Sequence, residues 1–192
     1  MATNGSSSSE ATPVVSTLPG PDHNWQVTLA GKVIAITGAN QGIGLGLAEV
    51  VLANSAAHHQ LALDFTMDQV KRLFELNVFG AWNCATAAAK TFIKLGIKGS
   101  IVFTASMTSY RPNRAVPSAP YGGTKAAVRN MTHTLAMEWA KHGIRVNSIS
   151  PGFVKTALTY YELGGAYVYL LSDTATYTTG IDIPVAGIVG AW

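Results

Sequence analysis

The sequence predicts an α/β fold built around a parallel sheet, and three observations support this class. A short apolar, β-branched run at residues 32–36 is typical of a buried parallel strand. It leads through a glycine-rich turn at residues 37–44 into a helical run at residues 45–54. Further apolar strands at residues 99–105 and 144–149 alternate with long amphipathic stretches, the order that a parallel sheet with helical connections requires.

Composition limits the protein to a few classes. The 192 residues are enough for one domain, and 48% of them are hydrophobic whereas 12% are charged. Lys and Arg are scattered, with no basic stripe beside aromatic residues, so nucleic-acid binding is not expected. The single cysteine, Cys84, excludes an internal disulfide and fits a reducing compartment. No apolar run is long enough to span a membrane.

The first part of the chain differs from the rest. Residues 1–24 are rich in Ser, Thr, Pro and Gly, so we expect a disordered tail before a single domain at residues 25–192. No Lys or Arg precedes Lys32, which argues against a secretory or mitochondrial signal. These features predict a cytoplasmic protein.

The glycine-rich turn has the spacing of a dinucleotide-binding loop. In T-G-A-N-Q-G-I-G, Gly38 permits a tight turn, Gly42 lets the backbone approach a pyrophosphate, and Gly44 permits close packing of helix on strand. The following helix N-terminus offers N–H groups to phosphate oxygens. The alternative is an ordinary glycine turn, but the strand before it and the helix after it favour phosphate binding.

A long helix is expected from residue 66 to residue 95. Thr66 and Gln69 form a capping box, and Asn77 falls within the apolar stripe of the helix. A buried amide without a partner costs roughly 1–3 kcal/mol, so Asn77 has either a structural backbone bond or a functional role. The stripe consists of Val70, Leu73, Phe74, Val78, Ala81, Trp82, Ala85, Ala88, Ala89 and Phe92.

Ser106, Tyr121 and Lys125 carry the chemistry expected of the site. Ser106 ends the strand at residues 99–105, where open α/β sheets bind ligands, although a serine there is often only a turn former. Tyr121 and Lys125 lie four residues apart on one face at the start of a helix. A phenol has a pKa near ~10, and a neighbouring ammonium favours its ionised form, so the pair can exchange a proton with a carbonyl or an alcohol. By itself, such a pair also occurs by chance on surface helices.

The remaining elements follow in order. The Tyr121 helix places Val128, Met131, Leu135 and Trp139 on one stripe and ends at Gly143, a natural C′ residue. The strand at residues 144–149 runs into a loop at residues 150–156. A helix at residues 162–171 and a short strand at residues 181–183 complete the chain.

The motifs T-G-x-x-x-G-I-G and Y-x-x-x-K together resemble the short-chain dehydrogenase/reductase family from Leu29 onward. The resemblance implies a Rossmann-like doubly wound parallel sheet. It makes Tyr121 the acid/base, Lys125 the residue that lowers the Tyr121 pKa, and Ser106 the partner of the substrate carbonyl. Asn77, in L-N-V-F-G, matches the family asparagine that supports a proton-relay water.

The resemblance also implies a nicotinamide cofactor and a secondary alcohol or ketone substrate. Context around Ser106 and at residues 137–140 is similar to fungal polyol and sugar reductases, which favours NADP(H) over NAD(H); polyketide-type ketone reductases are the alternative. A homo-oligomer through the helices at residues 66–95 and 121–142 is expected, and no metal site is predicted. The implied cofactor-binding residues are Gly38, Asn40, Gln41, Gly42, Ile43, Gly44, Tyr121, Lys125, Pro151, Gly152, Val154 and Thr156.

Two blocks of the family pattern are missing. Only residues 55–65 separate the first helix from Thr66, where the family has three strands and an N-A-G segment, and no substrate lid follows Tyr161. We therefore expect a sheet reduced by several strands and weak dinucleotide binding. The alternative function is an inactive relative that acts only through protein association. The alternation of Leu61, Leu63 and Phe65 with polar or small residues predicts a substitute strand beside residues 32–36.

Overall fold

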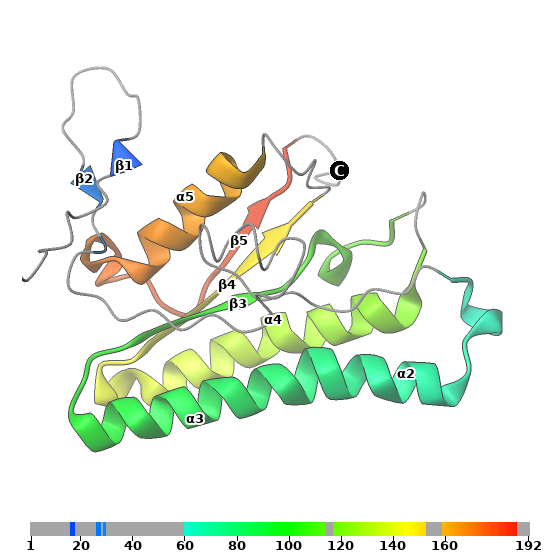
Figure 1. The fold of residues 1–192 in the computed structure, drawn as a ribbon, viewed down its shortest axis with the longest axis horizontal. Coiled ribbons are helices and arrows are strands. Elements are labelled where there is room, and N and C mark those ends of the chain that lie inside the picture. Colours follow the sequence, from blue (N-terminus) through cyan, green and yellow to red (C-terminus); the bar gives the residue numbers. More distant parts are fainter. Residues whose placement is uncertain are drawn as a thin grey trace, which may run out of the picture.

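The computed structural model describes residues 16–17, 26–27, 29, 60–113, 117–152 and 159–187, with the side chains of residues 16–17, 26–27 and 159–162 left out (Figure 1). The strands are β1 (Ser16–Thr17), β2 (Gln26–Val27), β3 (Ser100–Thr104), β4 (Arg145–Pro151) and β5 (Asp182–Val185). The α-helices are α2 (Met67–Phe74), α3 (Gly80–Leu95), α4 (Ala119–Trp139) and α5 (Thr159–Leu171). Shorter turns are η1 (Ala62–Asp64), η2 (Glu75–Phe79), η3 (Met107–Ser109), η4 (Ala140–His142) and η5 (Asp173–Ala175).

The sheet is parallel, as predicted, with the order β3-β4-β5. Ser100 pairs with Arg145 at one end of the β3–β4 ladder, and Thr104 pairs with Ile149 at the other. On the far side of β4, Ser148 pairs with Asp182. Because β4 has a neighbour on each side, it is the most buried of these strands, and its buried polar side chains Asn147 and Ser148 are hydrogen-bonded to Thr178 and Asp182.

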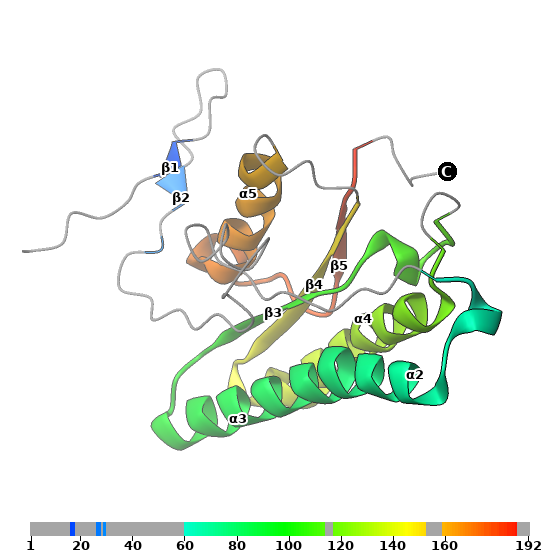
Figure 2. The ribbon, with the colours of Figure 1, turned by 45° about the vertical axis from the view of Figure 1, so that its right-hand side comes forward.

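Three layers enclose two cores (Figures 1 and 2). Helices α3 and α4 cover one face of the sheet, and α5 covers the other. Strand residues alternate between the cores, since Phe103 joins the α3–α4 side whereas its neighbour Val102 packs on the α5 side. The first core consists of Ala85, Ala89, Phe103, Val128, Leu135, Ala136, Ile144 and Val146. The second consists of Ile149, Leu163, Tyr167 and Leu170.

The two strand–helix–strand connections have opposite hands. Both move one position in the same direction across the sheet, from β3 to β4 and from β4 to β5. Helix α4 crosses one face, whereas α5 crosses the other (Figure 2). One of the two connections therefore departs from the right-handed rule for parallel strands. The consequence is a sandwich with the long helices together on one side.

The predicted long helix is confirmed in its position, but it contains a π-helical segment. The Thr66–Gln69 capping box is present, with both reciprocal bonds formed. Helix α2 then passes through the π segment η2 into α3, and Asn77 lies within η2. Most of the expected stripe faces the sheet side, but Trp82 is 43% exposed. A π segment rotates the residues that follow it, so a regular helical period cannot describe both halves of the helix.

The prediction of a substitute strand at Leu61–Phe65 is wrong. Residues 62–64 form the 3₁₀ turn η1, and Leu61 and Leu63 are 63% and 99% exposed. The amide of Asp64 donates to the carbonyl of Leu61 at 3.0 Å, and the Gln60 side chain donates to the Asp64 carbonyl. These local bonds close a turn directly before the Thr66 cap, leaving no length for a period-two strand.

Several predictions lie outside the described residues. These are the strand at residues 32–36, the glycine loop at residues 37–44 and the helix at residues 45–54. Within the expected tail, Ser16–Thr17 pairs antiparallel with Gln26–Val27, and the domain boundary stays a prediction. Among the helices that the structure describes, none is long and apolar enough to cross a lipid bilayer.

Candidate active site

The predicted catalytic residues gather where the strands end. Ser106 follows the last residue of β3 by two positions, and Pro151 ends β4. Helix α4 returns over the sheet from this edge, so its first turn, with Tyr121, begins beside the carboxyl ends of the strands. Helix α4 begins at Ala119, two residues before the predicted start at Tyr121. The predicted stop at Gly143, which has a positive φ of 70°, is confirmed, and the turn η4 lies between Trp139 and Gly143.

Lys125 is a buried amine beside Tyr121. Its side chain is 2% exposed, and its Nζ donates to the Thr104 carbonyl at 2.7 Å. The same Nζ lies 5.7 Å from the centre of the Tyr121 ring, within the range of a cation–π contact. Burial lowers the pKa of the Lys125 amine from its ordinary value of 10.5 to about 7. The structure therefore brings Lys125 next to Tyr121 and ties it to the strand end that precedes Ser106.

Asn77 is buried against the first turns of α4. Its Nδ2 donates to the Thr124 hydroxyl oxygen at 3.1 Å, and that hydroxyl donates to the Tyr121 carbonyl at 2.7 Å. Asn77 thus reaches the Tyr121–Lys125 segment through the Thr124 side chain, and its role in proton relay stays a prediction. Its place in a π segment is typical of functional sites in helices.

Ser106 is both a turn former and a site residue by position. Its Oγ accepts from the Thr108 amide at 3.2 Å and from the Thr108 hydroxyl at 2.9 Å, which caps η3. In both of these bonds Ser106 is the acceptor, so its own hydroxyl hydrogen is not used by them. Ser106 is buried at 8% exposure, and its predicted contact with a substrate carbonyl stays a prediction.

Two adjacent glycines in α4 differ in how closely other segments approach them, and η3 lies closest to Gly122. A Cβ on Gly122 would lie 3.1 Å from the Thr108 carbonyl oxygen, so the helix and η3 are nearly in backbone contact. On Gly123, the nearest atom to an added Cβ is Phe74 Cζ at 3.9 Å, an ordinary contact. A side chain at position 122 would therefore require the Thr108 carbonyl, and with it the turn that Ser106 caps, to move by a few tenths of an ångström.

The predicted cofactor residues are only partly described. The Gly152 amide donates to the Val185 carbonyl at 3.0 Å, and a Cβ there would lie 2.7 Å from the Ala186 Cβ. Only glycine permits this approach between the ends of β4 and β5. Gly38, Asn40, Gln41, Gly42, Ile43, Gly44, Val154 and Thr156 lie outside the described residues.

Comparison with known proteins assigns the family. The sequence model described as short chain dehydrogenase matches residues 50–163, more than half of the chain. The chain belongs to the short-chain dehydrogenase family. Its predicted Rossmann-type fold is confirmed by solved members. One is a short-chain type dehydrogenase/reductase from Mycobacterium marinum, 34% identical with a TM-score of 0.67 over 70% of this chain and 61% of that one.

The curated relatives of this chain include fungal sugar and polyol enzymes. Sorbose reductase of Schizosaccharomyces pombe is 39% identical over 166 residues, covering 74% of this chain and 64% of the relative. A probable NADP-dependent mannitol dehydrogenase of Yarrowia lipolytica is 37% identical over 138 residues, covering 60% and 49%. NADH-dependent L-xylulose reductase of Ambrosiozyma monospora is 33% identical over 156 residues, covering 67% and 57%. The chain thus spans between about half and two thirds of the length of these relatives.

Sequence reasoning missed a polar network beside the candidate site. The Tyr110 hydroxyl donates to Asp182 Oδ2 at 2.6 Å, and the Ser148 hydroxyl donates to Asp182 Oδ1 at 2.5 Å. The Arg129 guanidinium stacks 3.8 Å above the Tyr110 ring. One signal was available, because Asp182 places a charge at the start of the otherwise apolar strand β5.

A second missed residue is Tyr167, on the opposite face of the sheet. Its hydroxyl forms a 2.9 Å hydrogen bond with the Thr104 hydroxyl, while the Thr104 carbonyl accepts from Lys125. Burial raises the pKa of Tyr167 far above its ordinary value, so its phenol stays protonated. Thr104 therefore links Lys125, on the α4 side of the sheet, to Tyr167, on the α5 side.

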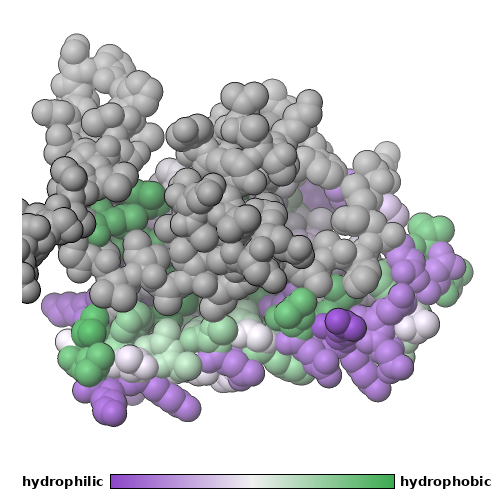
Figure 3. Space-filling view, in the orientation of Figure 1, coloured by the Kyte–Doolittle hydropathy of each residue, from purple (hydrophilic) through white to green (hydrophobic). Residues whose placement is uncertain are grey.

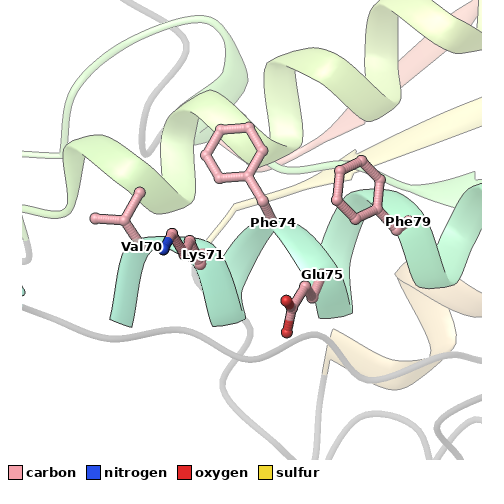
Figure 4. Close-up of a pocket in the computed structure, with 5 residues that line it drawn as sticks. All are labelled: Val70, Lys71, Phe74, Glu75 and Phe79. Carbon is pink, nitrogen blue, oxygen red and sulfur yellow. The ribbon is translucent and has the colours of Figure 1, made fainter. Parts of the chain in front are cut away.

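A shallow surface hollow lies apart from these residues (Figure 4). It has a volume of about 250 Å³ and is formed on α2 and η2, where the Phe74 ring points toward α4. The lining residues are Val70, Lys71, Phe74, Glu75 and Phe79. None of the predicted catalytic residues lines it.

Proposed function

We propose that this chain is an NAD(P)-dependent oxidoreductase that interconverts a secondary alcohol and a ketone. The observation that carries the proposal is the buried amine of Lys125 beside Tyr121 and the Ser106 strand end. Burial disfavours the charged form of this amine and so lowers its pKa. Strongly shifted pKa values cluster at functional sites, so the Lys125 amine is a functional-site candidate. Names of the relatives as reductases and dehydrogenases support the same reaction class.

In the proposed reaction, the residues of the chain handle the proton and orient the substrate. The Tyr121 phenol donates a proton to the carbonyl oxygen during reduction and takes it back during oxidation. With a pKa of about 7, the Lys125 amine is protonated in part near neutral pH, and its protonated form stabilises the oxyanion left on Tyr121. The Ser106 hydroxyl donates to the carbonyl oxygen. Asn77, bonded through Thr124 to this turn, supports the return of the proton. A nicotinamide, when bound, supplies or accepts the hydride.

The described residues fit the nicotinamide end of such a cofactor. Lys125 has three N–H donors and uses one of them for the Thr104 carbonyl, which leaves donors suited to ribose hydroxyls. Lys125 and Tyr121 would hold the nicotinamide ribose, and Pro151 and Gly152 would border the ring. NADP(H) is the favoured cofactor. Two relatives have NADP-dependent in their names, and another has NADH-dependent, so these names support either nicotinamide cofactor.

Sugars and polyols are the proposed substrate class. The relatives' names include sorbose, mannitol, L-xylulose and D-arabinitol. The test is to follow nicotinamide absorbance with purified protein, NADPH or NADH, and a panel of ketoses including sorbose and L-xylulose. We expect oxidation of NADPH that depends on a ketose. No turnover of any ketose or polyol with either cofactor would overturn the proposal.

Self-association through the long helices is proposed as well. Three large apolar side chains on this surface, Leu76, Phe79 and Trp82, are 53%, 57% and 43% exposed. Along the edge of the molecule formed by α2 and α3, apolar residues alternate with hydrophilic ones (Figure 3). Exposed apolar residues of this size favour contact with another protein surface, here a second copy.

The single cysteine, Cys84, supports a reducing, cytoplasmic setting.

A further inference from the structure

Two cations of α4 hold the backbone on either side of Ser106. Lys125 donates to the Thr104 carbonyl at 2.7 Å, two residues before Ser106. One turn further along the helix, Arg129 Nη2 donates to the Ser109 carbonyl at 3.2 Å, three residues after it. The segment with Ser106 is therefore tied to the catalytic helix at both ends. Only the Lys125 contact belongs to the predicted catalytic set.

Arg129 is itself held in place by Tyr110. The guanidinium carbon lies 3.8 Å from the Tyr110 ring centre, which is a close stacked contact. Tyr110 belongs to the same turn, since its amide donates to the Met107 carbonyl at 3.0 Å. Arg129 thus contacts this turn twice, through the Ser109 carbonyl and through the Tyr110 ring.

The far end of the network is anchored in the sheet. Asp182, the first residue of β5, accepts from the Tyr110 hydroxyl at 2.6 Å and from the Ser148 hydroxyl of β4 at 2.5 Å. Burial and the neighbouring Asp182 carboxylate raise the pKa of Tyr110, so its phenol stays protonated and keeps donating. Both Asp182 oxygens accept charge-assisted bonds, and these are stronger than neutral ones.

We propose that Arg129, Tyr110 and Asp182 are positioning residues for Ser106. They hold the turn that Ser106 caps in the position where the Ser106 hydroxyl can donate to the substrate carbonyl. The inference rests on the proposed function, because it assigns these residues to the Ser106 step of carbonyl reduction. It assigns them no contact with substrate or cofactor. Their effect is on the placement of one hydroxyl, and small displacements of such groups lower turnover strongly.

A double-mutant cycle tests this assignment kinetically. Tyr110→Phe removes only the hydroxyl, and we expect it to lower kcat on the order of tenfold with little change in KM or NADPH affinity. In the Ser106→Ala background, where there is no hydroxyl to place, the same change should have almost no further effect. An equal loss in both backgrounds would indicate general damage and overturn the assignment, as would full activity of Tyr110→Phe. Tyr177→Phe, at a fully exposed tyrosine, is the matched control and should match wild type.

Hydrogen exchange tests the same network without any turnover. The Thr108 amide is bonded to the Ser106 Oγ, and the Ser109 amide to the Ser106 carbonyl at 2.9 Å, so both report on the Ser106 turn. We expect Tyr110→Phe and Arg129→Lys to speed exchange at these amides, whereas Tyr177→Phe and Arg72→Lys, both on exposed side chains, do not. Unchanged exchange would overturn the inference even in an active enzyme. Faster exchange in a protein with no ketose reduction would instead count against the proposed function alone.

Discussion

The buried amine of Lys125 is expected to destabilise the fold in which it sits. Its pKa falls from 10.5 to about 7 because burial removes the ammonium from water. Between these two values the unfolded chain binds more protons than the folded one, so folding stability rises with pH in this window. Below about pH 7 the full penalty is present. A residue placed at such a cost is better explained by chemistry than by packing.

Replacing this amine should therefore stabilise the protein in a pH-dependent way. We expect Lys125→Met, which keeps the length of the side chain, to raise the free energy of unfolding at about pH 6, where the penalty is largest. The advantage over wild type should shrink above about pH 7, at up to about 1.4 kcal/mol per pH unit. Chemical denaturation of both proteins from about pH 6 to about pH 9 measures the difference directly.

An exposed lysine supplies the control for this measurement. Lys90 lies on the outer surface of α3, so Lys90→Met should show no comparable pH dependence. If Lys125→Met destabilises the protein equally at every pH, the Lys125 amine is satisfied as a cation, and its lowered pKa is contradicted.

At the scale of the helix, the two adjacent glycines of α4 differ in what surrounds them. Alanine is favoured over glycine by about 1 kcal/mol inside a helix, so either replacement gains the same propensity. At Gly123 the added Cβ has ordinary space, whereas at Gly122 it meets the Thr108 carbonyl at 3.1 Å. We expect Gly123→Ala to stabilise the protein, and Gly122→Ala to gain less or to destabilise it. Thermal unfolding of the two variants measures this.

The same pair also separates stability from activity. Because the Thr108 carbonyl belongs to the turn that Ser106 caps, Gly122→Ala should lower kcat, while Gly123→Ala should leave it close to wild type. Equal kcat values for the two variants would contradict the view that close packing of η3 on α4 positions Ser106.

Local sequence signals predicted most of the elements, and their limits are physical. The Thr66–Gln69 capping box and the Gly143 C′ position involve neighbours in sequence, so they could be predicted from a few residues. The strand at Leu61–Phe65 was predicted from alternation alone, and over so few residues a 3₁₀ turn with its own hydrogen bonds prevails. Helical periodicity also gave no indication of the π segment at Asn77.

The site could be predicted where motifs carry it, and not where the fold creates it. Tyr121 and Lys125 are four residues apart, so their proximity follows from helix geometry. The Tyr110–Asp182 bond joins residues 72 positions apart and depends on the order of β3, β4 and β5. Nothing in the chain near Tyr110 indicates that contact.

For the whole molecule, the opposite hands of the two connections place the long helices on one face of the described sheet, which is the surface proposed for self-association. Of the α-helices that the structure describes, α3 and α4 form one outer layer together, and α5 lies on the opposite face of the sheet (Figures 1 and 2). We expect Phe79→Glu, which places a charge on the exposed surface beside α3, to shift the protein toward monomer. Sedimentation over a range of concentrations measures the change.

A second exposed apolar residue controls for the added charge. Leu63 is 99% exposed but lies in η1, away from α3, so Leu63→Glu should leave the sedimentation behaviour unchanged. A wild-type chain that remains monomeric at every concentration would contradict self-association through the long helices.

The proposed reaction depends on one oxygen atom, the phenol of Tyr121. Tyr121→Phe removes this oxygen and keeps the ring that packs near the Lys125 amine, so the fold and NADPH binding should persist. The most direct test is ketose-dependent NADPH oxidation by Tyr121→Phe and wild type, with NADPH affinity measured on both. We predict that the variant binds NADPH like wild type but loses ketose reduction by at least about a hundredfold. Ketose reduction by Tyr121→Phe at the wild-type rate would contradict Tyr121 as the proton donor.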